Sequence, residues 1–185
     1  MRYKEYNVNR VLEQSIDLFW QKGYNGCSIN DIVEKTGVNR FSLYHEFENK
    51  EGILYRSLNL YRERYSKEKL HLLNSDGKLT ETIKNYYLAY LEDQKSPVGG
   101  CYIIHLGTEL ADTDINVKNC VTEYLNEIQN LFQKLLLRHN YEENEAALKS
   151  RHLLGLFCTT MSFCLIHTPE EREEYALNGI KVILN

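Results

Sequence analysis

The chain has 185 residues and a net charge of −4. It has room for a small and a larger domain, and its acidic balance alone argues against a nucleic-acid binder. No apolar run is long enough to span a bilayer and the N-terminus is polar, so we expect neither a membrane protein nor a secreted one, but a cytoplasmic protein. The five cysteines have no C-x-x-C or Cys/His spacing, so we expect free thiols and neither a metal nor a cofactor.

The first two predicted helices are bounded by recognisable caps. Residues 7–22 carry an amphipathic helical pattern, and Gly23 ends it. Ser28 is a candidate N-cap for a second helix, with Asp31 three residues on in a shortened capping box. Gly37 closes this helix, because glycine tolerates the left-handed conformation that a helix C-terminus needs.

A third helix is predicted over residues 40–47, with Asn39 as its N-cap. Leu43 and Phe47 lie four residues apart and should face inward. A short helix with a polar and aromatic outer face fits the recognition helix of a helix-turn-helix. That outer face consists of Arg40, Phe41, Ser42, Tyr44 and His45.

The rest of the chain also has helical patterns, so the fold class is all-α with about nine helices. Turn signals at residues 74–77 and a breaker-rich loop at residues 95–100 separate these later segments. The six further helices are predicted over residues 49–72, 79–94, 101–110, 115–139, 142–167 and 170–184.

The run GYNGCSINDIVEKTGVNRFSLYHEFENKEGIL, residues 23–54, resembles the DNA-binding domain of the TetR (tetracycline repressor-like) family of bacterial transcription regulators. Many typed positions agree without a gap, among them Gly37, Arg40 and Tyr44. Val33, Phe41 and Glu46 depart from the family pattern. Because Phe41 and Glu46 lie on or near the reading face, the resemblance implies DNA binding but names no operator sequence.

The resemblance implies a helix-turn-helix DNA-binding domain over residues 1–48 and a helical effector-binding and dimerisation domain over residues 49–185. The implied function is a repressor that leaves a near-palindromic DNA operator when a small molecule binds the C-terminal domain. Eight side chains would contact DNA: Arg40 and His45 at bases, Phe41 at a thymine methyl, Ser28, Tyr44 and Lys50 at phosphates, and Asn39 and Ser42 beside them.

The charge distribution partly offsets the acidic total. Residues 1–70 hold 12 Lys and Arg against 10 Asp and Glu, whereas residues 71–185 hold 10 against 16. This N-terminal excess is small, so phosphate contacts must come from a few placed side chains and from helix N-termini.

The resemblance continues weakly into the C-terminal part, where residues 100–110 look like the G-C-[LF]-[LIV]-x-N-x-x-x-E-[LV] segment of one TetR subgroup. The last two helices usually form a homodimer interface in this family. Residues 153–166 are apolar nearly all round, which suits such an interface or, alternatively, a central core helix. The interface residues we expect are Gly155, Thr159, Phe163 and Tyr175.

A high tyrosine content suggests a cavity for a hydrophobic or aromatic effector, although the same residues could simply fill an aromatic core. The candidate ligand-binding residues are Tyr86, Tyr87, Tyr90, Tyr102, His105, Phe132, Phe157 and Met161.

Cys101 supports an alternative mechanism. It follows two glycines at the start of a predicted helix, where the helix dipole favours a thiolate that could be oxidised or alkylated. The competing interpretation is a small buried residue.

Two other classes of protein, an enzyme and a helical interaction protein, compete with a transcription regulator. Cys101, His105 and Glu109 share one helical face in a conceivable nucleophile–base–orienter order. Without a phosphate loop, H-E-x-x-H or nucleophile elbow, however, we expect no enzyme and no catalytic residue. A helical interaction protein with a vestigial helix-turn-helix is disfavoured by the intact Arg40, Tyr44 and Lys50.

Overall fold

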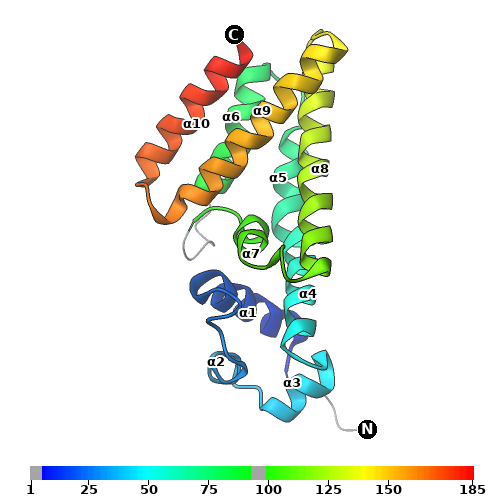
Figure 1. The fold of residues 1–185 in the computed structure, drawn as a ribbon, viewed down its shortest axis with the longest axis vertical. Helices are drawn as coiled ribbons and strands as arrows, with labels where there is room; N and C mark the ends of the chain where they lie inside the picture. Colours follow the sequence, from blue (N-terminus) through cyan, green and yellow to red (C-terminus); the bar gives the residue numbers. More distant parts are fainter. Residues whose placement is uncertain (1–5, 93–98) are drawn as a thin grey trace.

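The computed structural model describes residues 6–92 and 99–185, and within these ranges the chain is helical with no strand, which confirms the all-α expectation. The molecule is elongated, with α1, α2 and α3 at one end and α6, α8, α9 and α10 at the other (Figure 1). None of the described helices is long and apolar enough to cross a membrane.

The three N-terminal helices form a compact unit, which we call the head: α1 (Val8–Lys22), α2 (Ile29–Thr36) and α3 (Arg40–Phe47). Its predicted caps are confirmed. The Ser28 hydroxyl accepts the Asp31 amide in a complete capping box, and the Asn39 side chain accepts the Ser42 amide at 2.9 Å. Gly37 ends α2 in the left-handed conformation, at φ 70°.

A continuous helical rod leads from the head into the rest of the molecule. It comprises α4 (Lys50–Tyr61), a π-helical turn η1 (Arg62–Ser66) and α5 (Lys67–Leu72). Asn49, the residue at which this helix was expected to begin, caps its start by accepting the Gly52 amide at 2.7 Å. The sequence pattern predicted one helix over residues 49–72 but not the π turn. Such turns are rare and occur often at functional sites.

The remaining helices form the body: α6 (Leu79–Leu91), α7 (Tyr102–Leu110), α8 (Ile115–Arg138), α9 (Glu143–Ser162) and α10 (Pro169–Leu184). Helices α8 and α9 pack along each other, and α10 packs on α6 and α9. Helix α7 lies across the junction, where it contacts both α1 and α4 of the N-terminal half and α8 and α9 of the body.

One predicted helix ends earlier than expected, and the predicted end of another lies outside the described residues. The helix expected over residues 142–167 stops at Ser162 and tightens into a 3-10 turn, Phe163–Leu165, before Thr168 caps α10. A full α-helix to residue 167 would leave no room for the chain to reverse and pack α10 back on α9. The expected end of the fifth helix at residues 93–94 and most of the predicted loop, residues 95–98, lie outside the described residues.

Candidate nucleic-acid interface

Helix α3 presents a continuous outer face at the far end of the head. Phe41 is 80% exposed and Tyr44 41% exposed, and Arg40 and His45 are also exposed. Leu43, by contrast, is fully buried, because helical spacing places it on the side that packs against the head. The predicted reading face is therefore available to a partner as one surface.

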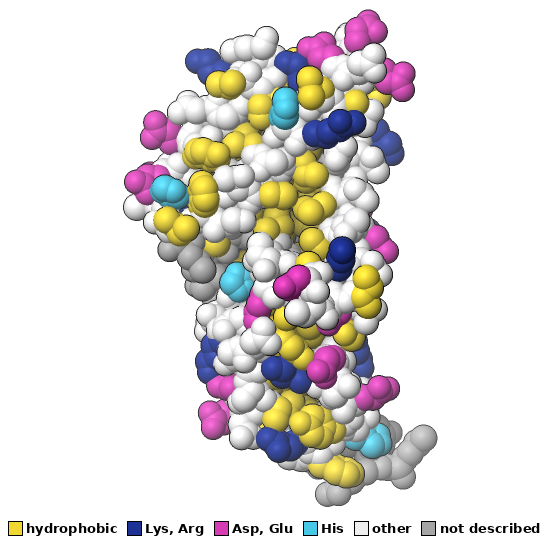
Figure 2. Space-filling model, viewed as in Figure 1, with side chains coloured by type: hydrophobic (Ala, Val, Ile, Leu, Met, Phe, Trp, Pro, Cys, Tyr) yellow, Lys and Arg dark blue, Asp and Glu magenta, His cyan; other side chains and the backbone are white. Residues whose placement is uncertain are grey.

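On the face of the head that Figure 2 shows, side chains of both charges are mixed and form no large basic patch. Lys22 and Asp31 form an ion pair beside the N-terminus of α2. Hydrogen bonds from Lys22 and Ser28 hold the pKa of Asp31 well below its usual range, so this carboxylate stays ionised. Contacts to nucleic-acid phosphates must therefore come from individual side chains.

Arg40 and Ser28 reach this surface with local partners already in place. The Arg40 guanidinium donates to the Asn30 side-chain oxygen at 2.9 Å, which ties the start of α3 to α2. The Ser28 hydroxyl donates to Asp31 at 2.5 Å and is exposed. A bound base or phosphate would compete with these exposed bonds, which are weak in water.

Lys50 lies differently from the other predicted DNA contacts. Its half-buried ammonium donates to the carbonyl oxygens of Cys27 at 2.8 Å and Tyr24 at 2.9 Å, and it sits 3.9 Å from the centre of the Tyr24 ring. Lys50 thereby ties the first turn of α4 to the α1–α2 loop. A contact to phosphate was predicted from the sequence, and this internal role was not.

Glu109 forms the other tie to the same loop. Its two carboxylate oxygens accept the backbone amides of Tyr24 at 2.8 Å and Asn25 at 2.7 Å. Helix α7 is thus clamped to the head. Among the described residues Glu109 bonds to this loop and makes no hydrogen bond to His105, so the nucleophile–base–orienter order of Cys101, His105 and Glu109 is not formed there.

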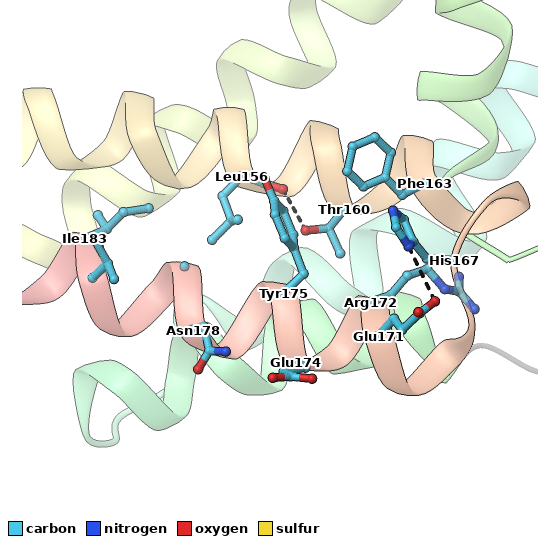
Figure 3. A pocket seen from close by; sticks show the side chains of 12 residues that line it. Leu156, Thr160, Phe163, His167, Glu171, Arg172, Glu174, Tyr175, Asn178 and Ile183 are labelled. Atoms are coloured by element: carbon cyan, nitrogen blue, oxygen red, sulfur yellow. Dashed lines mark hydrogen bonds and ion pairs between the residues drawn. The ribbon is translucent and has the colours of Figure 1, made fainter.

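An open groove runs between α9 and α10, with a volume of about 560 Å³ (Figure 3). Two of the expected interface residues, Phe163 and Tyr175, line it with ring centres 5.8 Å apart. Tyr175 is 46% exposed and Val182 77% exposed. Gly155, also expected at the interface, is exposed, and an added Cβ there would meet nothing within 4 Å. Thr159 is half-buried on the same helix.

Most of the predicted ligand-binding residues fill the core instead of lining an open space. Tyr86 lies at the centre, with ring centres 5.2 Å from Phe157 and 5.4 Å from Phe132 and Tyr90. The fully buried members are Tyr86, Tyr87, Tyr90, Tyr102, Phe132 and Phe157. His105 and Met161 do come together, with Cys101, at a cavity of about 220 Å³.

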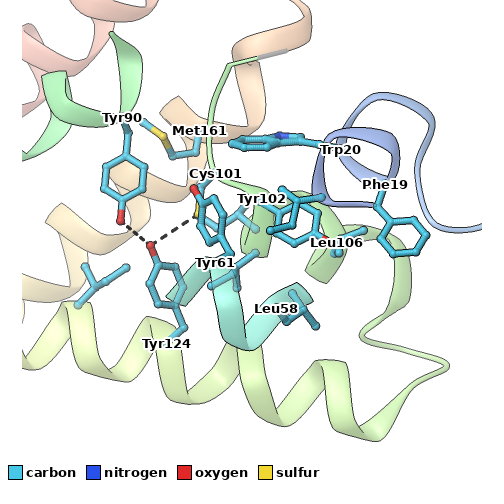
Figure 4. Packing of buried hydrophobic residues seen from close by; sticks show 14 of the residues in the cluster. Phe19, Trp20, Leu58, Tyr61, Tyr90, Cys101, Tyr102, Leu106, Tyr124 and Met161 are labelled. Carbon is cyan, nitrogen blue, oxygen red and sulfur yellow. Dashed lines mark hydrogen bonds between the residues drawn. The ribbon is translucent and has the colours of Figure 1, made fainter. Parts of the chain in front are cut away.

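Cys101 sits inside a cluster of tyrosines (Figure 4). Its thiol donates to the Tyr124 hydroxyl at 3.6 Å, and that hydroxyl shares a 2.7 Å hydrogen bond with Tyr90. Burial raises the pKa of the Cys101 thiol, which opposes the effect expected from its place at a helix start. Tyr124 was not among the predicted site residues, although it lies one helical turn from Ile128 on the apolar stripe of α8.

The sequence of the head matches that of known proteins. Residues 11–56 match the sequence model of the bacterial regulatory proteins, tetR family. The head of this chain is therefore similar in sequence to the N-terminal region of the tetR family of bacterial regulatory proteins. This family consists of non-enzymatic DNA-binding regulators.

Individual proteins of known sequence or structure are also similar to this chain. The HTH-type transcriptional repressor ComR of Escherichia coli K12 is 31% identical over 121 residues, which cover 64% of this chain and 58% of ComR. The uncharacterised regulator YezE of Bacillus subtilis 168 is 24% identical over 82% of each chain. A cysteine mutant of the TetR family regulator CifR, complexed with operator DNA, has a TM-score of 0.86 at 16% identity and covers 97% of this chain and 98% of CifR.

Proposed function

We propose that this chain is a homodimeric transcriptional repressor that binds a near-palindromic DNA operator through α3 and leaves it when a small molecule binds. In this proposal residues 1–48 are the DNA-binding domain, and residues 49–185 bind the effector and form the dimer. The observation that carries the proposal is the exposed face of α3, presented by a capped helix-turn-helix.

The chemistry of that face suits the major groove of DNA. The Arg40 guanidinium can make two hydrogen bonds to a guanine edge, and the exposed Phe41 ring can contact a thymine methyl group. His45 stacks on Phe41 with ring centres 6.4 Å apart, so these two side chains would enter the groove together. ComR, described as a repressor, and CifR, solved with operator DNA, support repression and DNA as the partner.

The groove between α9 and α10 supports a homodimer. Helix α10 leaves the Tyr175 and Val182 side chains exposed there, next to the half-buried Leu156 of α9, and exposed apolar patches mark interaction surfaces. A second copy that uses the same surface would pair the two heads about a twofold axis. Each head would then read a half-site, with centres roughly 34–36 Å apart or a multiple of that spacing.

A second mechanism, release by chemical modification of Cys101, has less support. The thiolate is the reactive form of cysteine, and burial shifts Cys101 toward the thiol. We therefore propose reversible binding of an effector as the mode of control.

The test is an operator selected from a random DNA pool and measured by fluorescence anisotropy. Arg40→Ala should cost ~1–3 kcal/mol in operator affinity and relax the preference at one base position. Lys134→Ala is the matched control, because it removes an exposed positive charge on α8, far from α3 in the fold. Unchanged affinity and base preference in Arg40→Ala would refute the proposed role of α3.

A further inference from the structure

A second cleft, of about 310 Å³, lies between α1 and the rod. One wall belongs to the head and includes Gln14, Asp17 and Trp20 of α1. The other wall consists of Tyr61, at the end of α4, and Tyr65, in the π turn η1. A molecule in this cleft would touch both the head and the helix that joins it to the body. Neither the predicted DNA contacts nor the expected effector cavity uses it.

Three aromatic rings form the apolar part of the cleft. The Trp20 and Tyr61 rings meet edge to face with centres 5.6 Å apart, and the Tyr61 and Tyr65 rings also lie 5.6 Å apart. The faces of such rings carry partial negative charge and attract cations, most strongly when water is excluded.

Asp17 brings to the cleft an acceptor that the protein leaves without a donor, next to the side chain of Gln14. Gln14 donates through its side-chain nitrogen to the Lys35 carbonyl at 3.1 Å, yet its buried Oε1 has no partner among the described residues. The Asp17 carboxylate likewise has no hydrogen bond or ion pair within the described part of the chain. Residues three apart on a helix are neighbours on one face, so these acceptors lie side by side.

The charges around the cleft favour a cation at the Asp17 end. Burial raises the pKa of Asp17 more than the nearby Lys35 lowers it, because the carboxylate has lost water without gaining an ion pair. Glu13, the other lining carboxylate, is already paired with Arg64 at 2.6 Å. Arg10 lines the cleft two helical turns before Asp17, so its positive charge lies toward the opposite end.

We propose that this cleft binds a small primary amine with an apolar or aromatic body. Its ammonium group donates to the Asp17 carboxylate, and its body packs against Trp20, Tyr61 and Tyr65. The binding site stands without the proposed function. Only the effect of the ligand on DNA binding depends on the proposed function, because a ligand here would favour one angle between head and rod.

Trp20 gives a direct assay, because it is the single tryptophan of the chain and it lines the cleft. We would titrate the full chain with phenethylamine, 2-phenylethanol and 3-phenylpropanoate while recording Trp20 emission. These probes share an aromatic body and differ in charge. Phenethylamine should give a saturable change, 2-phenylethanol should bind about tenfold more weakly, and the carboxylate should not bind, because a charged hydrogen bond is the stronger one.

Asp17→Asn keeps the size of the side chain and removes its charge, so phenethylamine and 2-phenylethanol should then bind equally. Glu63→Gln is the matched control: Glu63 lies in the same π turn, is exposed and pairs with Lys67 away from the cleft, so the tenfold preference for the amine should remain. Equal binding of amine and alcohol to the parent chain, or no emission change with the amine, would overturn the proposal.

Operator affinity, measured in the same samples, separates the two ideas. Loss of operator binding on addition of phenethylamine would support both the site and its effector role. Saturable amine binding that leaves operator affinity unchanged would support the site and reject its effector role. A parent chain that binds the amine but no DNA would retain the site and reject the proposed function.

Discussion

The Glu109 carboxylate accepts a hydrogen bond from the backbone amide of Tyr24, 85 residues earlier in the chain, at 2.8 Å. Together with the bond from Asn25, this contact fixes the α1–α2 loop to α7. Any movement of α7 must therefore either carry the head with it or break two hydrogen bonds to a charged group.

We expect Glu109→Gln to loosen this joint. The neutral amide offers one acceptor oxygen instead of two and turns a donor toward the loop, so the free energy of unfolding should fall by about 1–2 kcal/mol. Amide hydrogen exchange should rise at Tyr24 and Asn25. Glu123→Gln, which alters an exposed carboxylate on α8, is the control, and equal exchange in both variants would contradict the proposed clamp.

Lys50→Met should destabilise the head as well as weaken DNA binding. The substitution keeps an unbranched apolar stem but removes two hydrogen bonds to backbone carbonyls, so the free energy of unfolding in urea should fall by about 2 kcal/mol. Operator and random DNA should lose affinity alike. Lys67→Met removes an exposed lysine from the rod and should change neither property. A Lys50→Met chain of normal stability would show that the internal bonds contribute little.

Gly155→Glu and Val182→Glu should convert the dimer to a folded monomer. Both positions are exposed, so the variants should fold, but a charge would be buried without a partner if α9 and α10 pair with a second copy. Leu137→Glu places the same charge on an exposed apolar position of α8 and is the control. Sedimentation at micromolar concentration checks this, and a parent chain that is already monomeric would refute the proposed interface.

His105 should make the protein less stable in acid. Burial lowers the pKa of His105, so the folded chain binds fewer protons than the unfolded chain below about pH 6.5. The stability that neutral His105 contributes above that pH is lost as the pH falls through the pKa of His105 in the folded chain. His105→Gln should therefore reduce the change in melting temperature between pH 7.5 and pH 5. A variant with the same pH dependence as the parent would mean that other groups dominate.

Two tyrosine variants in the core should behave oppositely. The buried Tyr86 hydroxyl has no hydrogen-bond partner among the residues that the structure describes, so Tyr86→Phe should leave stability unchanged or raise it. Tyr124→Phe would remove the 2.7 Å hydrogen bond of the buried Tyr90 hydroxyl, so the free energy of unfolding should fall by about 1–3 kcal/mol. Denaturant midpoints of the two variants measure the difference. Equal destabilisation would mean that the Tyr86 hydroxyl has a partner in solution.

Local features of the fold could be predicted from the sequence because they depend on neighbouring residues. The caps at Ser28, Asn39 and Asn49 and the helix ends at Gly23 and Gly37 follow from side chains that bond within three residues or from the freedom of glycine. The same holds for the inward positions of α3, which helical spacing determines.

Contacts between distant segments could not be predicted in this way. Nothing in the local pattern pairs Glu109 with Tyr24, or Lys50 with the carbonyl of Cys27. The tyrosines of α6 are buried, but whether they fill a core or line a cavity depends on how α8 and α9 pack over them. The cleft beside Trp20 also exists only once α1 has docked on the rod.

The π turn in the rod has a mechanical consequence. Helix α4, from Lys50 to Tyr61, forms an arm ~18 Å long between this turn and the head. A π turn is wider than its neighbours and its hydrogen bonds shift by one residue, so we expect this helical rod to bend there. A bend of about 10° there displaces the start of α4 by about 3 Å. In the proposed dimer the two displacements would add, to a distance comparable to the rise of nearly two base pairs of DNA.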